Sequence, residues 1–213
     1  MKGLFVSGSG TDVGKTYVAL LLIKILNKKY TVRPRKPIES DCIKSKGGLI
    51  PKDATLLAEA CNSNEPLDHV CRFRFESCSS PEKASNDEGV TITLSELKSA
   101  CQSNTNEDYV IVEGAGGLYS PIARELLNSE LAQALGLPVV LVVKDELGAI
   151  NQALMSVQAA KAQKLEVAMI VLNQIVPNSL DNKKAISSYT NVPVVALDNK
   201  HLKRFNVEAG SLI

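Results

Sequence analysis

The sequence lacks four features that would place it in other classes of protein. No apolar run reaches the roughly 18 residues that a membrane-spanning helix needs, and the N-terminal apolar segment continues into a glycine-rich stretch without a signal-peptide pattern. Lysine and arginine total 24 against 23 acidic residues, so a net charge of +1 gives no general attraction to nucleic acid or anionic membranes. The five cysteines include no C-x-x-C pair, which argues against zinc or redox chemistry. We therefore expect a cytoplasmic protein with reduced thiols that binds neither nucleic acid nor membrane.

The glycine-rich stretch at residues 7–16 is the most informative part of the chain. It follows an apolar segment of strand length, 3–6, and continues into an apolar helix-like segment, 17–23. A loop in this position binds phosphate oxygens through its backbone N–H groups and the helix N-terminus. Lys15 would then reach the β- and γ-phosphates, and the Thr16 hydroxyl would ligate Mg²⁺. The alternative is a turn that only packs the strand against the helix.

Length and hydrophobic patterning predict the fold class. The chain has 213 residues, 45% of them hydrophobic, which suits one domain over 1–213. Apolar runs alternate with helical patterns, so we expect an α/β, P-loop NTPase-type three-layer fold with a mostly parallel sheet and helices on both faces. The segment 62–90 reads as a long excursion, and the tail after Asp198 has no clear period. Further strand-like runs are 31–38, 109–113, 138–143, 167–172 and 193–197, and helix-like segments are 53–61, 94–104, 125–135, 147–163 and 179–189.

Three charged residues are expected at the same edge of this sheet. Glu113 ends the strand 109–113 before a glycine-rich turn, which suits a Walker-B carboxylate that binds Mg²⁺ or orients its water. Lys36 ends another strand and could neutralise a transferring phosphoryl group together with Lys15, and Asp53 begins a helix as a candidate metal ligand. Each has a plainer alternative: a polar strand end, a solvated lysine, and a carboxylate that favours a helix N-terminus.

A resemblance to one family is carried by five blocks of residues: 10–16, 36–40, 53–54, 112–117 with 120–121, and 147–151. On these blocks the chain resembles dethiobiotin synthetase from residue 1 to about residue 175. The resemblance implies an ATP- and Mg²⁺-dependent reaction in which 7,8-diaminononanoate and CO₂ or bicarbonate give dethiobiotin, ADP and phosphate in biotin synthesis. It also implies a homodimer whose substrate site is shared across the interface.

The resemblance also implies a role for individual residues. The catalytic residues would be Lys36, Lys15 and Thr11. The nucleotide would be bound by Asp12, Val13, Gly14, Lys15, Thr16 and Tyr17, with Asn173 reading its base. Mg²⁺ would be held by Thr16, Asp53 and Glu113. The substrate would contact Thr11, Lys36, Ser40, Gly116, Gly117 and Leu118, with Leu147 and Asn151 acting across the dimer interface.

Several positions depart from the family pattern. Asp41 replaces a common glycine, and Glu82 stands where histidine is frequent. Ser9, separately, replaces the first glycine of the general phosphate-loop pattern G-x-x-x-x-G-K-[ST], so the loop is a variant of that pattern. Glu146 is acidic where a basic residue is often found, and residues 196–199 replace a Gly-x-Ile-Pro segment, which leaves the base preference open.

Two other classes of protein share this type of loop. One is a ParA-like nucleotide-switch ATPase that binds DNA or membrane, and the other is a non-catalytic P-loop relative. The near-zero charge and the lack of an evident basic amphipathic C-terminal helix argue against the first. The departures at Asp41, Glu82, Glu146 and residues 196–199 keep the second open.

Overall fold

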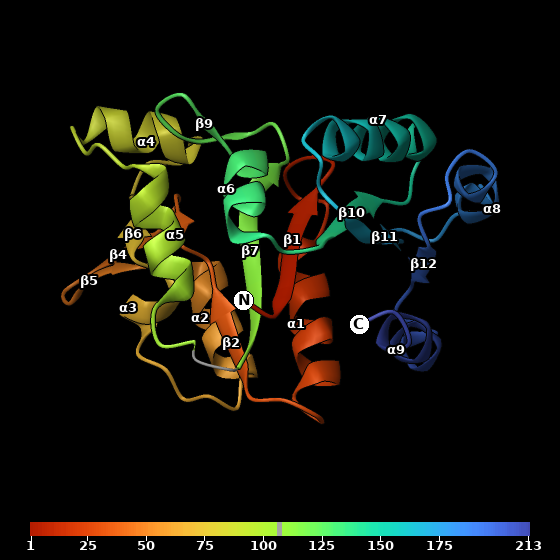
Figure 1. The fold of residues 1–213 in the computed structure, drawn as a ribbon, viewed down its shortest axis with the longest axis horizontal. Coiled ribbons are helices and arrows are strands. Elements are labelled where there is room, and N and C mark those ends of the chain that lie inside the picture. Colours follow the sequence, from red (N-terminus) through yellow and green to blue (C-terminus); the bar gives the residue numbers. More distant parts are fainter. Residues whose placement is uncertain (106–107) are drawn as a thin grey trace.

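The computed structural model describes residues 1–105 and 108–213, and a six-stranded parallel sheet lies at its centre (Figure 1). The strand order is β12-β11-β10-β1-β7-β2. After β1 the chain forms β2, two positions away on one side, and β7 later fills the position between them. The next strand of the sheet, β10, lies on the other side of β1, so the order in which strands are added changes direction beside β1. In open α/β sheets, ligands bind at the carboxyl end of the strand where this reversal occurs. The strands are β1 (Gly3–Gly8), β2 (Val32–Arg35), β7 (Tyr109–Gly117), β10 (Val139–Lys144), β11 (Val167–Asn173) and β12 (Val194–Leu197).

Helices cover both faces of the sheet (Figure 1). Two hydrophobic clusters fill the spaces between the layers. Successive side chains of β1 point to opposite faces of the sheet. Phe5 packs in the cluster that contains Leu131 of α6 (Asn128–Leu135), and Val6 packs in the cluster that contains Leu22 of α1 (Lys15–Leu26). This arrangement confirms the predicted three-layer α/β fold. The helices are α1 (Lys15–Leu26), α2 (Lys52–Ala60), α3 (Leu67–Val70), α4 (Pro81–Asp87), α5 (Leu94–Gln102), α6 (Asn128–Leu135), α7 (Ala149–Ala162), α8 (Asn182–Ser187) and α9 (Leu202–Gly210).

Two predicted strands were wrong at their carboxyl ends. The run 31–38 leaves the sheet after Arg35, because Pro37 has no N–H to continue the ladder and the next two residues pair elsewhere as β3 (Ile38–Glu39) with β6 (Phe73–Arg74). The strand expected over 109–113 continues to Gly117, so Glu113 lies inside β7 and not at its end. The glycines permit this extension, since a side chain at Gly117 would press on the backbone of β1.

Two predicted helices start later than expected. Residues 126–127 of the segment 125–135 form β9 (Leu126–Leu127), which pairs antiparallel with β8 (Pro121–Ala123), and the helix begins at Asn128. In the segment 179–189 the helix begins after Asp181, whose φ of 46° is left-handed. The other predicted helices agree with α2, α5 and α7 to within two residues at each end.

The least regular part of the sequence is more structured than expected. The excursion 62–90 contains α3, β6 and α4, and Ser80 caps α4 by accepting from the Lys83 N–H. The tail contains α9, which packs on α1 through the buried Phe205 and Ala209, four residues apart. A C-terminal helix is therefore present although the tail shows no clear helical period, and its apolar side is buried against α1.

A small hairpin completes the described structure. Strands β4 (Ile43–Ser45) and β5 (Gly48–Ile50) pair antiparallel beyond β3. Within residues 1–105 and 108–213, no helix is both long and apolar enough to cross a bilayer.

Candidate active site

The loop between β1 and α1 is held in one shape by contacts from neighbouring segments. Gly14 precedes α1 with φ of 92°, and a Cβ there would overlap the amide of Asn173, so this position requires glycine. Asn173, at the end of β11, donates from Nδ2 to the Val13 carbonyl at 3.0 Å. Lys15 Nζ donates to the Gly10 carbonyl at 2.9 Å. The lysine side chain thus folds back over the loop.

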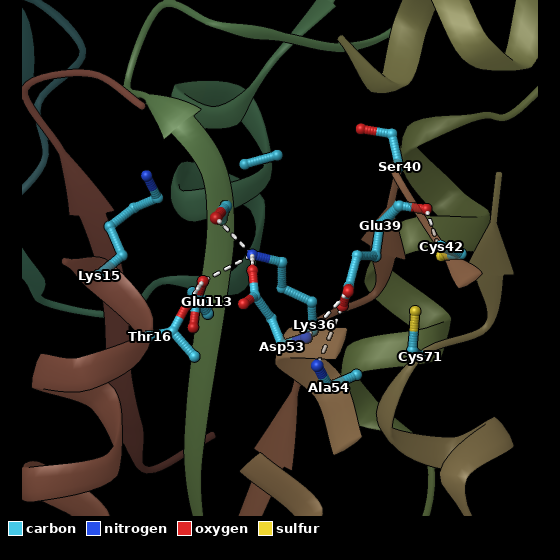
Figure 2. Close-up of polar contacts among 12 residues, drawn as sticks. Lys15, Thr16, Lys36, Glu39, Ser40, Cys42, Asp53, Ala54, Cys71 and Glu113 are labelled. Carbon is cyan, nitrogen blue, oxygen red and sulfur yellow. Dashed lines mark hydrogen bonds and ion pairs between the residues drawn. The ribbon is translucent and has the colours of Figure 1, made fainter. Parts of the chain in front are cut away.

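A second cation lies beside two carboxylates (Figure 2). Lys36 Nζ is 2.5 Å from Glu113 Oε1 and 3.1 Å from Asp53 Oδ2. The Thr16 hydroxyl donates to the same Glu113 oxygen at 3.0 Å. Lys36 comes from the connection between β2 and β3, and Glu113 comes from β7. Asp53 and Thr16 lie in the first turns of α2 and α1. The fold therefore brings together four residues that the sequence marked separately.

Burial and charge shift the two lysine pKa values in opposite directions. Burial alone would lower the pKa of Lys36, but the adjacent Glu113 and Asp53 outweigh it and raise that pKa well above its ordinary value. Burial lowers the pKa of Lys15, and repulsion from Lys36 lowers it further. Lys36 is therefore firmly protonated, whereas Lys15 holds its proton less tightly.

The oxygen atoms around Glu113 suit a small hard cation. Glu113 Oε2 is buried and has no hydrogen-bond partner within residues 1–105 and 108–213, while Oε1 accepts from both Lys36 and Thr16. The Asp53 side chain is 39% exposed toward the same cleft. Among the described residues, no group of three His, Cys, Asp or Glu side chains forms a complete metal site. Two carboxylates and a hydroxyl suit Mg²⁺, which commonly completes its shell with water and substrate phosphates.

These groups line a cleft of about 650 Å³. The segment 78–81, from the predicted excursion, forms part of its wall. The Ser40 hydroxyl donates to the Ser79 carbonyl at 2.6 Å and ties that wall to the end of β3. The predicted site residues in the cleft are Thr11, Asp12, Gly14, Lys15, Thr16, Lys36, Ser40, Asp53, Glu113 and Gly116.

The remaining predicted residues lie around this cleft. Gly117 and Leu118 line a neighbouring hollow of about 480 Å³ that is also lined by Met155 of α7. Leu147 is 88% exposed just before α7, and Asn151 is exposed on that helix. A single chain therefore does not bring these last two residues into the cleft.

Tyr17 is placed beside the region where the sequence departs from the family. Its hydroxyl donates to Asn199 Oδ1 at 2.9 Å, which joins the start of α1 to the segment after β12. Asn199, the last of the altered residues 196–199, therefore contacts the first turn of α1, directly after the phosphate loop.

Sequence reasoning missed Asn128, which is fully buried and supports the glycine-rich end of β7. Its Nδ2 donates to the carbonyls of Ala115 and Gly117, and its Oδ1 accepts from the Ala115 N–H. Nothing local indicates this role, because an asparagine at a helix start is usually a cap. Sequence reasoning also missed Glu39, a buried carboxylate at the edge of the cleft.

The departures from the family pattern are accommodated locally. Asp41 has a left-handed φ of 60°, the conformation for which glycine is favoured, and pairs with Lys52 at 2.7 Å. Glu146 pairs with Lys144 at 2.7 Å, so its charge is offset by a neighbour.

The fold and this site define a P-loop nucleotide-binding protein of the α/β class. The chain matches the AAA domain family over residues 2–197. It is 56% identical over 205 residues, 96% of this chain and 95% of the relative, to an ATP-dependent dethiobiotin synthetase BioD of Ruthia magnifica subsp. Calyptogena magnifica. It is 36% identical to one of Anaeromyxobacter dehalogenans strain 2CP-C, covering 83% of this chain and 78% of the relative. The chain belongs to the family of ATP-dependent dethiobiotin synthetases, as the sequence motifs predicted.

Solved structures with similar folds extend beyond that family. A plasmid partition protein from Borrelia burgdorferi superposes with a TM-score of 0.60 at 11% identity, covering 100% of this chain and 99% of the other. A ParA family ATPase from Chlorobium tepidum gives 0.54 at 13% identity, covering 100% and 92%. At these identities the likeness shows the fold alone.

Proposed function

We propose that this protein is the dethiobiotin synthetase of its organism: it uses ATP and Mg²⁺ to close the ureido ring of dethiobiotin from 7,8-diaminononanoate and CO₂, releasing ADP and phosphate. The observation that carries the proposal is the convergence of Lys15 and Lys36 with Thr16, Asp53 and Glu113 on one cleft at the phosphate loop. The identity to curated synthetases over nearly the whole chain supports the same conclusion.

The residues around Glu113 fit Mg²⁺. Thr16, Asp53 and Glu113 would hold the ion, with the unpartnered Glu113 Oε2 available to it or to its water. When bound, Mg²⁺ offsets the charge of the β- and γ-phosphates and orients them.

The chemistry brings two anions together, which requires fixed positive charge. One substrate amine adds to CO₂ as a carbamate and releases a proton, and a carbamate oxygen attacks the γ-phosphorus as ADP leaves. The second amine then attacks the carbonyl carbon of the mixed anhydride, and phosphate departs with loss of another proton. Lys15 would bind the phosphates, while Lys36 lies between them and the substrate side of the cleft, where Thr11 and Ser40 would hydrogen-bond the carbamate or diamine.

The substrate site would be completed by a second copy of the chain. Met155, 65% exposed, and Tyr119, 50% exposed, line the hollow at Gly117 and Leu118, and Leu147 is 88% exposed just before α7. Exposed large apolar side chains such as Met155 and Tyr119, side by side at one hollow, are typical of an interface, and two-fold dimers are the commonest assembly. In such a homodimer, Leu147 and Asn151 of one subunit would reach the substrate held beside the Gly116–Leu118 turn of the other.

The remaining assignments follow the same model of the reaction. Asp12, Val13, Gly14 and Tyr17 would surround the nucleotide with the two loop residues that bind its phosphates. Asn173, whose Nδ2 already supports the loop, would contact the base through its remaining amide oxygen. We further propose that the chain acts as one domain in the cytoplasm.

The first experiment is phosphate release from ATP and the other nucleoside triphosphates with Mg²⁺ and bicarbonate, with and without 7,8-diaminononanoate. Release that requires the diamine, with dethiobiotin formed in equal amount, is the expected result. Diamine-independent hydrolysis would indicate a nucleotide-switch ATPase, and no release with any nucleotide would indicate a non-catalytic relative.

A further inference from the structure

Glu39 is a buried carboxylate at the cleft that the mechanism above does not use. It lies at the end of β3, is only 5% exposed, and borders the same cleft as Lys36 and Asp53 (Figure 2). Burial raises its pKa, while Lys36 and two backbone N–H groups act in the opposite direction. A carboxylate held in such a place needs donors for both of its oxygens.

Both donors come from the first turn of α2. Glu39 Oε1 accepts from the Asp53 N–H at 2.9 Å, and Oε2 accepts from the Ala54 N–H at 3.0 Å. The helix has no cap of its own, because Pro51 occupies the capping position and offers no side-chain acceptor. Glu39 therefore supplies from another segment the acceptors that a helix N-terminus requires, and its negative charge suits the helix dipole.

This contact holds Asp53 at two points. Lys36 and Glu39 lie three residues apart, and Lys36 Nζ is 3.1 Å from the Asp53 carboxylate while Glu39 holds the Asp53 main chain. One short segment thus fixes both the position of Asp53 and the direction of its side chain. Without Glu39, the start of α2 would lose two hydrogen bonds, and Asp53 would be free to move away from Thr16 and Glu113.

We propose that Glu39 is a positioning residue, which holds the Asp53 carboxylate in place for Mg²⁺ by capping α2 from the end of β3. The inference rests on the proposed function, because it assumes that Asp53 serves the metal. It distinguishes Glu39 from an ordinary helix cap, which would stabilise the fold without affecting the affinity for the ion.

The test compares this cap with one that lies away from the cleft. Thr93 caps α5 by accepting from the Glu96 N–H at 3.2 Å, so Thr93→Ala removes a helix cap without touching the cleft. Glu39→Ala removes both acceptors at α2, and Glu39→Gln keeps the shape but places an amide donor against one N–H. Mg²⁺ affinity is measured by calorimetry in the presence of a non-hydrolysable ATP analogue, beside the Mg²⁺ concentration for half-maximal turnover.

The expected result is a loss of Mg²⁺ affinity on the order of 10-fold for both Glu39 variants, as is typical when a group that orients a metal ligand is removed. Thr93→Ala should leave the affinity within about twofold of wild type. In an Asp53→Asn background, Glu39→Gln should add less than a further twofold loss, since the residue through which it acts has already been altered.

Two results would overturn the inference. One is a Mg²⁺ affinity for the Glu39 variants that matches Thr93→Ala, and the other is an undiminished loss in the Asp53→Asn background. If Glu39→Ala does not fold, Glu39→Gln decides the question alone. A wild-type protein that forms no dethiobiotin would contradict the proposed function instead, and the two failures are therefore distinguishable.

Discussion

The Ser9 hydroxyl donates a hydrogen bond to Oε1 of Gln152 at 2.9 Å, which joins the phosphate loop to α7. Ser9 is the residue that departs from the usual glycine of this loop, and Gln152 lies on the helix that carries Asn151. The departure therefore adds a direct connection between the loop expected to bind nucleotide and the helix expected at the dimer interface.

Removing that connection should loosen the loop. We expect Ser9→Ala to lower the free energy of unfolding by about 1 kcal/mol, the usual net value of one such bond, and to raise the KM for ATP with little change in kcat. Urea unfolding and steady-state kinetics measure both effects. Gln152→Ala is the matched control: the double variant should lose little more than either single variant, whereas fully additive losses would mean that the two side chains act independently.

Replacing Lys36 should separate binding from catalysis. Lys36→Met retains the packing of the side chain but removes its charge, so turnover should fall by roughly 100-fold or more while an ATP analogue still binds. It also leaves Glu113 buried without its cation, which should reduce stability by about 3 kcal/mol when Mg²⁺ is absent. Unchanged turnover in a folded variant would assign Lys36 a purely structural role.

Replacing Glu113 should affect the metal first. Glu113→Gln keeps the shape of the side chain but removes the charge next to Thr16, so the Mg²⁺ concentration for half-maximal turnover should rise by about 10-fold. Loss of this partner should also lower the pKa of Lys36, which is raised mainly by Glu113. An unaltered Mg²⁺ titration would favour the plainer interpretation of Glu113 as a polar residue of the strand.

The parts of the site that could be predicted from sequence are those encoded by neighbouring residues. The phosphate loop lies between its own strand and helix, so its position followed directly from the pattern. Lys36 and Glu113 could be placed at one sheet edge because parallel strands share that edge, although Pro37 and the glycines after Glu113 shifted both strand ends.

The parts that could not be predicted depend on contacts between distant segments. Asn128 and Glu39 each satisfy backbone groups of another element, and neither side chain differs in type from many exposed residues. The sequence similarly does not show that Ser9 meets Gln152, 143 positions later. The helix α9 is a different case, since the spacing of Phe205 and Ala209 was available as a signal.

The opposite pKa shifts of the two lysines predict how nucleotide binding depends on pH. In the proposed site Lys15 would bind phosphate as a cation. Burial and Lys36 lower its pKa from an ordinary value of 10.5, so affinity for an ATP analogue should begin to fall at a pH below 10.5. The raised pKa of Lys36 keeps that residue charged throughout this range. The same shift affects stability. Between the lowered pKa of Lys15 and 10.5, this residue binds fewer protons in the folded protein than in the unfolded chain. Its burial therefore lowers the free energy of unfolding fully at a pH below this window, and that penalty disappears as the pH rises through the window.

Removing the second lysine provides the check on this assignment. In Lys36→Met the repulsion is gone while Asp53 and Glu113 remain, so the pKa of Lys15 should rise and the alkaline loss of affinity should move to higher pH. Calorimetric titration of the analogue from pH 7 to pH 10, with the wild type and this variant in the same buffers, measures the displacement. Gln152→Ala, which alters no charge, should leave the profile in place. A profile that is the same in Lys36→Met as in wild type, or that moves to lower pH, would show that a group other than Lys15 controls nucleotide binding.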